Sequence, residues 1–428
     1  MDAIARIRAR NGAVRAFLYT RLDEARGDYD ARMRESPRSG LHGMPYSLKD
    51  MWDTADIPTT GGSYRFRDRT PSESSPVHTL FDAAGAVLLG KTSLSDLAIV
   101  PEASNYFVGR TSNPHDSTRT SGGSSGGAAA AVADGMVAFD WGSDFGGSIR
   151  LPSAYCGVYG VRLSTEAWPV RGMFPMLPPS VGWMNGQGPI TGSVGLMETV
   201  LKVAAHTLRT GSATRFEPRG VMLYAPDRGT SGQWPTFADD VRPGLRRSLE
   251  EVREDHGLPS PSQARLFGPE MVASHFDDLM AADDSISFRE GARAVLSSIV
   301  LRGMTGDRRF HPQTAAMLAL IALGRYTIYS NRERALAKVN RFRDQIRELW
   351  HRGYVVAMPT VTFPAPRHGT TMFNPQLISF SMLGNISDAT ALAIPFGHYA
   401  GGLPRSMQLL GPPGSEFELL RVAERMAT

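Results

Sequence analysis

The segment SDFGGSIR, residues 143–150, places a serine directly after two adjacent glycines. Because Gly146 and Gly147 carry no side chains, the backbone N–H groups from Phe145 to Ser148 can converge on one point, as an oxyanion hole requires. This pattern makes Ser148 a candidate nucleophile for acyl transfer, with the stabilising N–H groups supplied by its own loop.

A serine nucleophile needs a base, and the candidate is Lys49 in the apolar stretch MPYSLKDMW. None of the ten histidines stands in an evident catalytic setting. Lowering a lysine pKa from about 10.4 towards about 7 or 8 costs about 4 kcal/mol, which only a dry site imposes. The alternative is an ion pair between Lys49 and a neighbour such as Asp50, and composition alone favours that alternative.

Ser124 offers a second candidate nucleophile, because Gly122, Ser124 and Gly126 satisfy the G-x-S-x-G pattern of a nucleophile elbow. An elbow follows an apolar strand, whereas the preceding residues NPHDSTRTS are polar. It also requires a catalytic histidine downstream, and the sequence points to no particular one. We therefore favour Ser148 over Ser124 as the nucleophile.

Residues 85–92, GAVLLGKT, match the phosphate-loop pattern G-x-x-x-x-G-K-[ST] through Gly85, Gly90, Lys91 and Thr92. In a phosphate loop, the residues between the glycines form the turn that wraps the phosphates. Here they are the apolar run AVLL, which is typical of a buried strand. The segment is therefore predicted to be a strand, and neither ATP nor any other cofactor is expected.

The composition narrows the class of protein. The 428 residues are 42% hydrophobic and 21% charged, which suits a globular enzyme of one or two packed domains. Basic and acidic residues are mixed along the chain, so no nucleic-acid partner is expected. Cys156 is the only cysteine, which excludes an intrachain disulfide and a cysteine-based zinc site. Since no apolar run reaches about 18 residues, we expect a soluble, cytoplasmic protein without integral membrane association.

Hydrophobic periodicity alternates between strand and helix along the chain and predicts an α/β fold. Helices are expected within 3–34, 76–84, 240–256, 312–329 and 331–350, and in the small residues that begin the segment AAAAVADGMVAF. Strands are expected around Lys49, ending near Phe139, and at 85–92, 220–225 and 353–360. A final strand, glycine-rich loop, strand and helix are expected over residues 389–426.

Three segments resemble the core of the amidase signature family: GMPYSLKD, TRTSGGSSGGAAAAVADG and DWGSDFGGSIRLPSAYCGVYGVR. The spacing agrees as well, because Ser124 and Ser148 are 24 residues apart, as in the family. The resemblance extends from residues 85–98 to 394–414, so it covers nearly the whole chain.

The resemblance implies one large domain over residues 1–428, with a central mixed β-sheet flanked by helices on both faces. It divides the chain into a signature core at about 40–205, a variable helical region at about 226–350 and a C-terminal part of the core at about 353–428.

The family uses a Ser–cis-Ser–Lys triad, and each member has a match here. Ser148 matches the nucleophile, Ser124 the bridging serine on a cis peptide, and Lys49 the base that begins the proton relay. Three residues match the oxyanion-hole donors: Phe145, Gly146 and Gly147. Three more match supporting positions: Ser125, Asp144 and Arg150.

The implied activity is that of an amidohydrolase, which cleaves a carboxylic amide through an acyl-enzyme to give a carboxylic acid and ammonia or an amine. The expected partner is a small-molecule amide substrate, with no metal and with a homodimer as an open option. The alternatives are an acyltransferase or esterase, an amidotransferase subunit, or a non-catalytic binding protein on the same fold. The chain departs from the family pattern at four places, so no particular substrate is carried over: residues 183–186, Gly192, Asp388 and Thr390.

Overall fold

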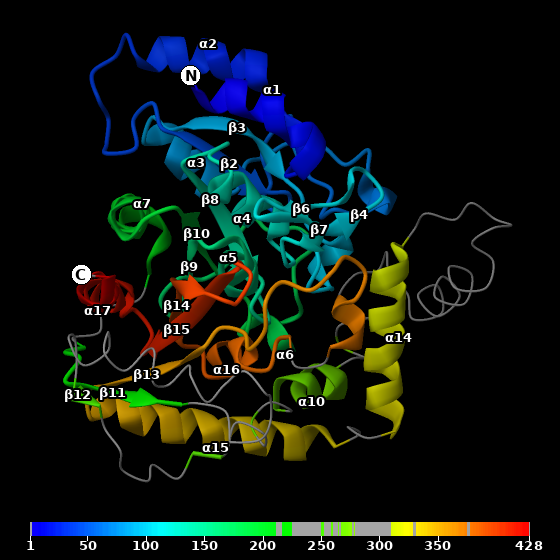
Figure 1. The fold of residues 1–428 in the computed structure, drawn as a ribbon, viewed down its shortest axis with the longest axis vertical. Helices are drawn as coiled ribbons and strands as arrows, with labels where there is room; N and C mark the ends of the chain where they lie inside the picture. Colours follow the sequence, from blue (N-terminus) through cyan, green and yellow to red (C-terminus); the bar gives the residue numbers. More distant parts are fainter. Residues whose placement is uncertain are drawn as a thin grey trace, which may run out of the picture.

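The computed structural model describes residues 2–210, 216–224, 250–251, 258–259, 264, 267–275, 278, 310–327, 331–374 and 377–427. Within these residues, an 11-stranded sheet crosses the molecule (Figure 1). In sheet order the strands are β1 (Phe17–Thr20), β3 (Val87–Thr92), β2 (Pro45–Lys49), β8 (Phe139–Asp144), β10 (Gly186–Thr191), β9 (Tyr159–Arg162), β14 (Thr390–His398), β15 (Pro404–Gly411), β13 (Tyr354–Pro359), β11 (Gly220–Leu223) and β12 (Glu250–Glu251).

The sheet is mixed, as expected. Strand β2 runs parallel to both β3 and β8, and β11 runs parallel to β13. The neighbouring pairs β8–β10, β9–β14 and β14–β15 are antiparallel. Two small antiparallel pairs lie outside this sheet: β4 (Ser104–Asn105) with β5 (Gly109–Arg110), and β6 (Ser112–Asn113) with β7 (Asp116–Thr120).

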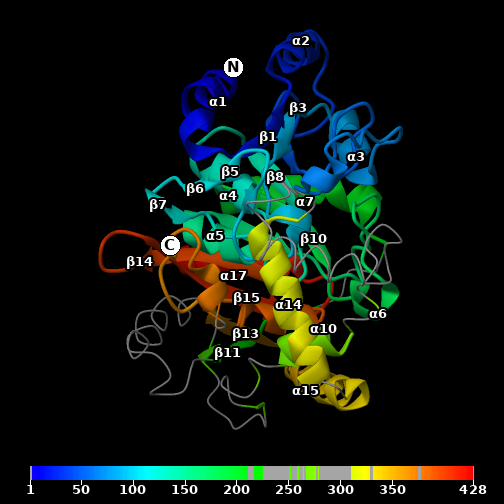
Figure 2. The ribbon, with the colours of Figure 1, turned by 90° about the vertical axis from the view of Figure 1, so that its right-hand side faces the viewer.

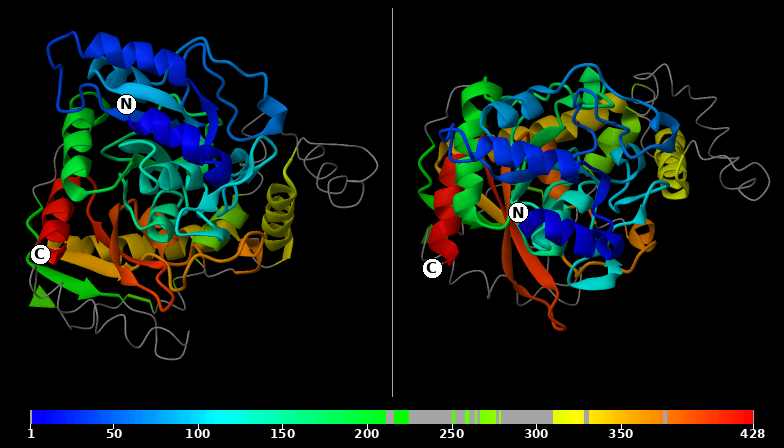
Figure 3. Two further views of the ribbon diagram at one scale, coloured as in Figure 1. Left: turned by 45° about the horizontal axis from the view of Figure 1, so that its top comes forward. Right: turned by 90° about the horizontal axis from the view of Figure 1, so that it is seen from above.

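Helices cover both faces of the sheet, as Figures 1 and 3 show. One face carries α3 (Pro76–Ala83), α7 (Val194–Leu208) and α17 (Glu416–Ala427). The other carries α4 (Gly126–Ala133), α5 (Arg150–Cys156), α16 (Ser381–Ile386), α10 (Phe267–Ser274) and α15 (Arg332–His351). The α/β fold predicted from the sequence, with helices on both faces of a mixed sheet, is therefore confirmed.

The remaining helices lie around this core. Beside β1 at one end of the sheet lie α1 (Asp2–Val14) and α2 (Leu22–Arg32), whereas α14 (Pro312–Thr327) stands apart from α7 and α17 and faces the viewer in Figure 2. Four short helices complete the described part of the chain: η1 (Tyr64–Phe66), η2 (Asp96–Ala98), α6 (Pro179–Gly182) and η3 (Thr371–Phe373). No helix among the described residues has the length and hydropathy needed to cross a membrane.

Strand β13 shows how the sequence builds two apolar layers. Its side chains alternate between the faces of the sheet, as in any strand. Val355 and Ala357 pack in the cluster that contains α7 and α17, whereas Val356 and Met358 pack with α15 and α16. All four are almost fully buried, which is why this strand reads as a continuous apolar run.

Most of the predicted elements are present. The structure confirms α3, β3, α4, β11, β13, α15 and the final β14, β15 and α17, and it confirms α14 to residue 327. The helix predicted over 240–256 is wrong at its described residues, because Glu250 and Glu251 form β12, and the rest of it lies outside the described residues. The helical segment 3–34 contains an unexpected strand, β1, since the backbone of Arg15 has a φ of 58° and ends α1.

The strand predicted to end near Phe139 begins there instead. Strand β8 runs from Phe139 to Asp144 and is buried throughout. Its polar side chains concealed it from a search for apolar residues, but each has a partner: Asp140 Oδ2 accepts from Ser47 Oγ at 2.6 Å, and Ser143 Oγ accepts from Lys49 Nζ at 2.9 Å. Paired polar groups are compatible with a buried strand.

The segment that matches a phosphate loop is the buried strand β3, as predicted. Lys91 Nζ donates at 2.7 Å to both the Trp52 carbonyl and Thr59 Oγ1, and it lies 3.4 Å from Asp50 Oδ1. Its ammonium is therefore bonded inside the protein. The strand geometry is incompatible with a loop that wraps phosphates.

Helix α4 begins with glycines because neighbouring backbone lies against it. The Gly127 N–H donates to the Ser93 carbonyl at 2.9 Å. A Cβ at Gly127 would lie 2.4 Å from the carbonyl oxygens of both Ala16 and Ser93, far inside contact distance. This close approach fixes α4, and with it the preceding serine loop, against β3.

We predict that Gly127→Ala lowers the free energy of unfolding by about 2 kcal/mol, because overpacking typically costs about 1–3 kcal/mol. Gly27→Ala in α2 is the matched control, since nothing lies within 4 Å of a Cβ placed there. That change is expected to stabilise the protein by about 0.5–1 kcal/mol. Urea denaturation measures both, and a Gly127→Ala protein as stable as the parent contradicts the packing described.

Candidate active site

The predicted site residues come from three segments that meet at one edge of the sheet. Lys49 ends β2, and β8 ends at Asp144 and leads into the loop of Ser148. Because β2 and β8 are parallel neighbours, their carboxyl ends lie at the same edge. The third segment, residues 121–125, precedes α4, which packs on β8 and β2 in the middle of the molecule (Figure 1).

Lys49 is fully buried. Its Nζ donates to Ser124 Oγ at 2.6 Å and to Ser143 Oγ at 2.9 Å. Burial lowers the pKa of Lys49 from 10.5 to about 7, although the carboxylates of Asp144 and Asp140 act in the opposite direction. The expected alternative, an ion pair with Asp50, is wrong, because Asp50 pairs with Lys91.

Ser124 follows a cis peptide bond, between Gly123 and Ser124, as the family resemblance implies. Its side chain is buried, and its hydroxyl oxygen accepts a hydrogen bond from Lys49 Nζ. A Cβ at Gly123 would lie 2.4 Å from the Glu102 backbone nitrogen, so only glycine fits beside this serine. The segment before Ser124 is β7, a short polar strand outside the main sheet, which does not provide the core strand that a nucleophile elbow needs.

Ser148 lies in the loop between β8 and α5 and, unlike Lys49 and Ser124, is partly exposed. Its carbonyl accepts a hydrogen bond from the Ser125 N–H at 3.1 Å, which ties the two serine loops together. The Ser148 hydroxyl has no hydrogen bond to any residue that the structure describes. The structure thus forms the contact between Lys49 and Ser124 and leaves the Ser148 hydroxyl free to meet a ligand.

Ser125 and Ser143 support the lysine and its neighbour. The Ser125 hydroxyl donates to the Ser143 carbonyl at 3.4 Å, and the Ser143 hydroxyl accepts from Lys49. Ser143 was not among the residues predicted from the sequence. Its position at the start of the second glycine block is typical of a loop, and only the β2–β8 pairing brings it to Lys49.

Asp144 and Arg150 form a buried ion pair that closes the Ser148 loop. Arg150 Nη2 lies 2.9 Å from Asp144 Oδ1, and Arg150 Nε donates to Oδ2 at 3.0 Å. Burial alone would raise the pKa of Asp144, but the charge of Arg150 and hydrogen bonds from Arg150 and Asn385 hold it well below its ordinary value. The Asp144 carboxylate also accepts from the Ile149 N–H at 3.1 Å, so it binds both ends of the loop.

Two C-terminal residues complete this network, and the sequence did not single them out. Asn385 of α16 donates to the Asp144 carbonyl at 2.7 Å and to its Oδ1 at 2.9 Å. Gln408 of β15 accepts from Arg150 Nη1 at 2.7 Å. Each is a single amide side chain among mainly apolar neighbours in the sequence. That isolation was the only feature of the sequence that could have identified them.

The peptide unit between Gly146 and Gly147 is held at both ends. Ser381 Oγ donates to the Gly146 carbonyl at 2.8 Å, and the Gly147 N–H donates to Asp144 Oδ1 at 2.8 Å. The Gly147 N–H is therefore engaged in this structure and is not free to bind an oxyanion, contrary to the sequence prediction. Because the Gly147 N–H is bound to the charged Asp144 carboxylate, two of the predicted oxyanion-hole donors remain as candidates. They are the N–H groups of Phe145 and Gly146.

One departure from the family pattern has a clear structural explanation. Asp388 has a φ of 52°, a left-handed conformation that suits glycine, the customary residue there. Its carboxylate pairs with the buried Arg162 at 2.8 Å and accepts from the Thr165 N–H at 2.8 Å. These bonds compensate for the unusual backbone, and none of them involves the candidate triad.

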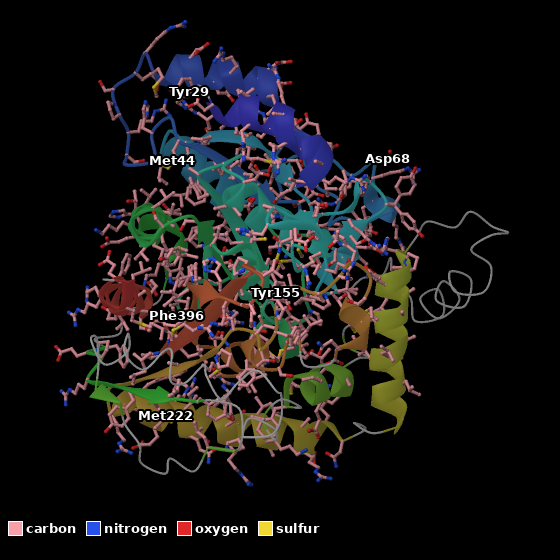
Figure 4. All side chains as sticks on the ribbon, in the orientation of Figure 1. Tyr29, Met44, Asp68, Tyr155, Met222 and Phe396 are labelled. Carbon is pink, nitrogen blue, oxygen red and sulfur yellow. The ribbon has the colours of Figure 1, made fainter. Side chains whose placement is uncertain are left out.

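The described residues contain no group of three or more His, Cys, Asp or Glu side chains arranged to hold a metal ion. Tyr155 of α5, which is labelled near the middle of the molecule in Figure 4, is buried in an apolar cluster that also contains Leu151 and Val361. The chemistry that the described site offers is that of its serines, its lysine and its backbone amides.

Comparison with known proteins connects this geometry to a family. A family model described as Amidase matches residues 1–233 and 239–420. One subunit of the glutamyl-tRNA(Gln) amidotransferase of Anaeromyxobacter sp. (strain K) is 30% identical, over 99% of this chain and 91% of that protein. The structure of a bacterial aryl acylamidase superposes with a TM-score of 0.75 at 22% identity, covering 99% of this chain and 91% of that one.

A second solved structure, a peptide amidase from Stenotrophomonas maltophilia, superposes with a TM-score of 0.72 at 22% identity and covers 99% of this chain and 91% of that one. At this identity the two structures establish the shared fold. They extend the likeness over the part of the chain that carries Lys49 and both serines.

We predict that Lys49→Met stabilises the folded protein at pH 7. The pKa of Lys49 falls from 10.5 to about 7 on folding, so between these values the unfolded chain binds more protons and stability rises with pH. Removing the amine avoids about 4 kcal/mol of this cost and loses two hydrogen bonds of about 1 kcal/mol each, for a net gain of about 2 kcal/mol. Urea denaturation of both proteins from pH 6 to 10 measures the difference in free energy of unfolding. A variant that is less stable than the parent, and whose stability depends on pH as the parent's does, contradicts a neutral lysine.

We predict that Asn385→Ala lowers the free energy of unfolding by about 2 kcal/mol, since it leaves buried partners on Asp144 and Arg150 unpaired. It should also slow the reaction of Ser148 with a fluorophosphonate about tenfold, because the loop loses its support. Ser387→Ala is the matched control, since that buried hydroxyl donates only to Leu383 and Gly384 in the same turn. Equal effects of the two substitutions on Ser148 would show that Asn385 has only a structural role.

Proposed function

The chain belongs to the amidase family and acts on amide bonds, and we propose that it does so through a triad of Ser148, Ser124 and Lys49. The observation that carries this proposal is the 2.6 Å contact between Lys49 Nζ and Ser124 Oγ in a site without solvent access to the lysine. A lysine with a pKa of about 7 is a base that can accept a proton near neutral pH.

In the first step, the Ser148 oxygen attacks the substrate carbonyl carbon while its proton passes to Ser124. Ser124 gives its own hydroxyl proton to the neutral amine of Lys49, which becomes an ammonium. The carbonyl π electrons move to oxygen, and the resulting oxyanion is stabilised by the N–H groups of Phe145 and Gly146. The Ser125 N–H donates to the Ser148 carbonyl, which holds the Ser148 loop next to the segment that carries Ser124.

In the second half of the reaction, the C–N bond breaks and the proton held by Lys49 returns through Ser124 to the leaving nitrogen. Ammonia or an amine departs and leaves an acyl group on Ser148. Water then gives a proton to the relay and attacks the acyl carbon. The bond between that carbon and Ser148 Oγ breaks, the relay returns the proton to the Ser148 oxygen, and a carboxylic acid is released. Lys49 ends both the acylation and the deacylation half of the cycle as a neutral amine, so each half returns the relay to its starting state.

The acceptor of the acyl group is a separate question from the nucleophile. The likeness to part of a glutamyl-tRNA(Gln) amidotransferase supports a second candidate function, in which this chain works within such an enzyme with the same acyl-enzyme. The two candidates differ in what the isolated chain does. Turnover of simple amides by the purified chain favours a stand-alone amidase, and labelling of Ser148 without any turnover favours an amidotransferase subunit.

Some expectations from the sequence stay predictions. They are the small-molecule amide substrate, the homodimer, the cytoplasmic location, and the division into a signature core, a variable helical region and a C-terminal part of the core. The acyltransferase, esterase and non-catalytic alternatives are addressed by the labelling experiment and by the choice of acyl acceptors offered to the enzyme.

We predict that a fluorophosphonate labels Ser148, and that peptide mass spectrometry locates it there. The labelling rate should fall about 100-fold or more in both Lys49→Met and Ser124→Ala, since general base catalysis contributes about 10²–10⁴-fold. Ser121→Ala is the matched control, because that buried hydroxyl of the same loop donates to the Thr111 carbonyl and not to Lys49.

The same rate should rise with pH through about 7. Below that value Lys49 carries a proton and cannot accept another, whereas above it the neutral amine predominates. Label on Ser124 in place of Ser148, or a Lys49→Met protein that reacts as fast as the parent, would contradict the proposed relay.

A further inference from the structure

Among the residues that the structure describes, the buried charged side chains on the segments around Lys49 are paired, with one exception. Asp144 is paired with Arg150 at 2.9 Å, and Asp50 is 3.4 Å from Lys91. Asp140 of β8 is equally buried, yet no lysine or arginine of the described chain lies within ion-pair distance of it. Unpaired buried carboxylates are rare, because the loss of hydration is costly.

The hydrogen bonds of Asp140 are unevenly distributed over its two oxygens. Oδ2 accepts from Ser47 Oγ at 2.6 Å and from Thr92 Oγ1 at 2.9 Å. Oδ1 is buried and has no hydrogen-bond partner among the described residues. Hydroxyl donors neutralise a carboxylate much less than a guanidinium does, so the negative charge of Asp140 remains largely uncompensated.

The two hydroxyl partners of Asp140 lie on the strand that carries Lys49 and on the strand next to it. Ser47 is two residues before Lys49 on β2 and pairs in register with Asp140. Thr92 on β3 is the cross-strand partner of Lys49. The carboxylate is therefore attached to the strand that carries the lysine and to the strand beside it, without touching the amine.

The other charges around Lys49 are already accounted for. The segments packed around it contribute five charged side chains: Asp140 and Asp144 from β8, Lys91 from β3, Asp50 from the turn after β2, and Arg150 from α5. Helix α4 and strand β10 contribute none. Four of the five form the two ion pairs, which leaves Asp140 as the unpaired anion beside a lysine that becomes a cation during the reaction.

The charge of Asp140 and that of Lys49 influence each other. Burial raises the pKa of Asp140 to about 6, whereas the hydroxyls of Ser47 and Thr92, the charge of Lys49 and the Lys49 backbone N–H lower it. Asp140 in turn raises the pKa of Lys49, against the effect of burial. At pH 7 to 8 the carboxylate is thus charged in the state in which the lysine is ready to accept a proton.

We propose that Asp140 is the counter-charge for the Lys49 ammonium that forms when Ser148 attacks. It acts through its charge, from a place fixed by the strand pairing, and not by contact with the amine. This inference rests on the proposed relay. A direct ion pair would keep the lysine protonated and unable to act as a base, whereas no counter-charge would make the proton transfer unfavourable in a dry site. A buried carboxylate on the adjacent strand β8 that makes no ion pair with the amine avoids both extremes.

The test is the pH dependence of fluorophosphonate labelling at Ser148, from pH 5 to 10, in the parent and in Asp140→Asn. Loss of the anion should move the rise in rate to lower pH by about one unit, because a buried charge several ångströms away has an effect of about this size. The rate on the plateau should fall about threefold or more, since the lysine becomes a weaker base.

Asp96→Asn is the matched control. Asp96 is also a buried aspartate whose pKa burial raises to about 6, and its Oδ1 likewise has no hydrogen-bond partner among the described residues. Its Oδ2 accepts from the His311 N–H at 2.6 Å, at the start of α14, and no lysine faces it. Asp96→Asn should therefore leave the pH midpoint of Ser148 labelling unchanged.

Thr92→Val provides a second variant, in case Asp140→Asn does not fold. It keeps the carboxylate, removes one of its two donors and conserves the side-chain shape. Asp140 then gains its proton at higher pH, so the rise in labelling should move in the same direction by a smaller amount. A purely structural role for Asp140 would lower stability in either variant and leave the midpoint in place.

The outcomes separate this inference from the relay on which it rests. A shifted midpoint in Asp140→Asn or Thr92→Val, with none in Asp96→Asn, supports the counter-charge. An unshifted midpoint in every variant that folds overturns it, while the dependence of the parent rate on Lys49 still upholds the relay. If the parent rate has no rise near pH 7 and does not depend on Lys49, the relay fails and the inference fails with it.

Discussion

The whole site depends on one constraint, which is the cost of holding a lysine out of water without an ion-pair partner. An exposed lysine is charged at neutral pH and cannot accept a proton. Lys49 has no exposed surface, and burial lowers its pKa to about 7, so the amine is available as a base. Two hydroxyls contact the amine in place of a carboxylate, from Ser124 in the loop before α4 and from Ser143 on β8. The parallel pairing of β2 and β8 brings Ser143 to the lysine, and the packing of α4 on both strands brings Ser124 there.

The reactive loop is held by parts of the chain that are far apart in sequence. Arg150 binds Gln408 at a separation of 258 residues, and Asn385 binds the Asp144 carbonyl at a separation of 241. Both partners lie in C-terminal elements, so the loop reaches its final geometry only when β15 and α16 are in place. The network contacts the backbone around Ser148 and leaves its hydroxyl free, which separates the support of the nucleophile from its chemistry.

The sequence alone predicted the residues with unusual chemistry and missed those that complete the geometry. Lys49 and the two serines were visible because their motifs are distinctive, and the structure brings Lys49 and Ser124 into contact. Strand β8 was misplaced because its polar residues resemble a loop, and they become compatible with a strand only through partners on other strands. Asn385 and Gln408 could not be predicted, since a single buried amide carries no local signal and its partners are set by tertiary structure.

The most direct test of the central claim is a measurement of the proton affinity of Lys49 itself. The chain has only four lysines, at positions 49, 91, 202 and 338, so protein labelled with ¹³C at the lysine Cε gives a simple spectrum. The Lys49 resonance is assigned by its absence from the Lys49→Met spectrum and followed from pH 5 to 11. A midpoint near 7 is the expected result. A midpoint near 10.5, the ordinary lysine value, would contradict the account, because the amine would then be protonated when it is needed as a base.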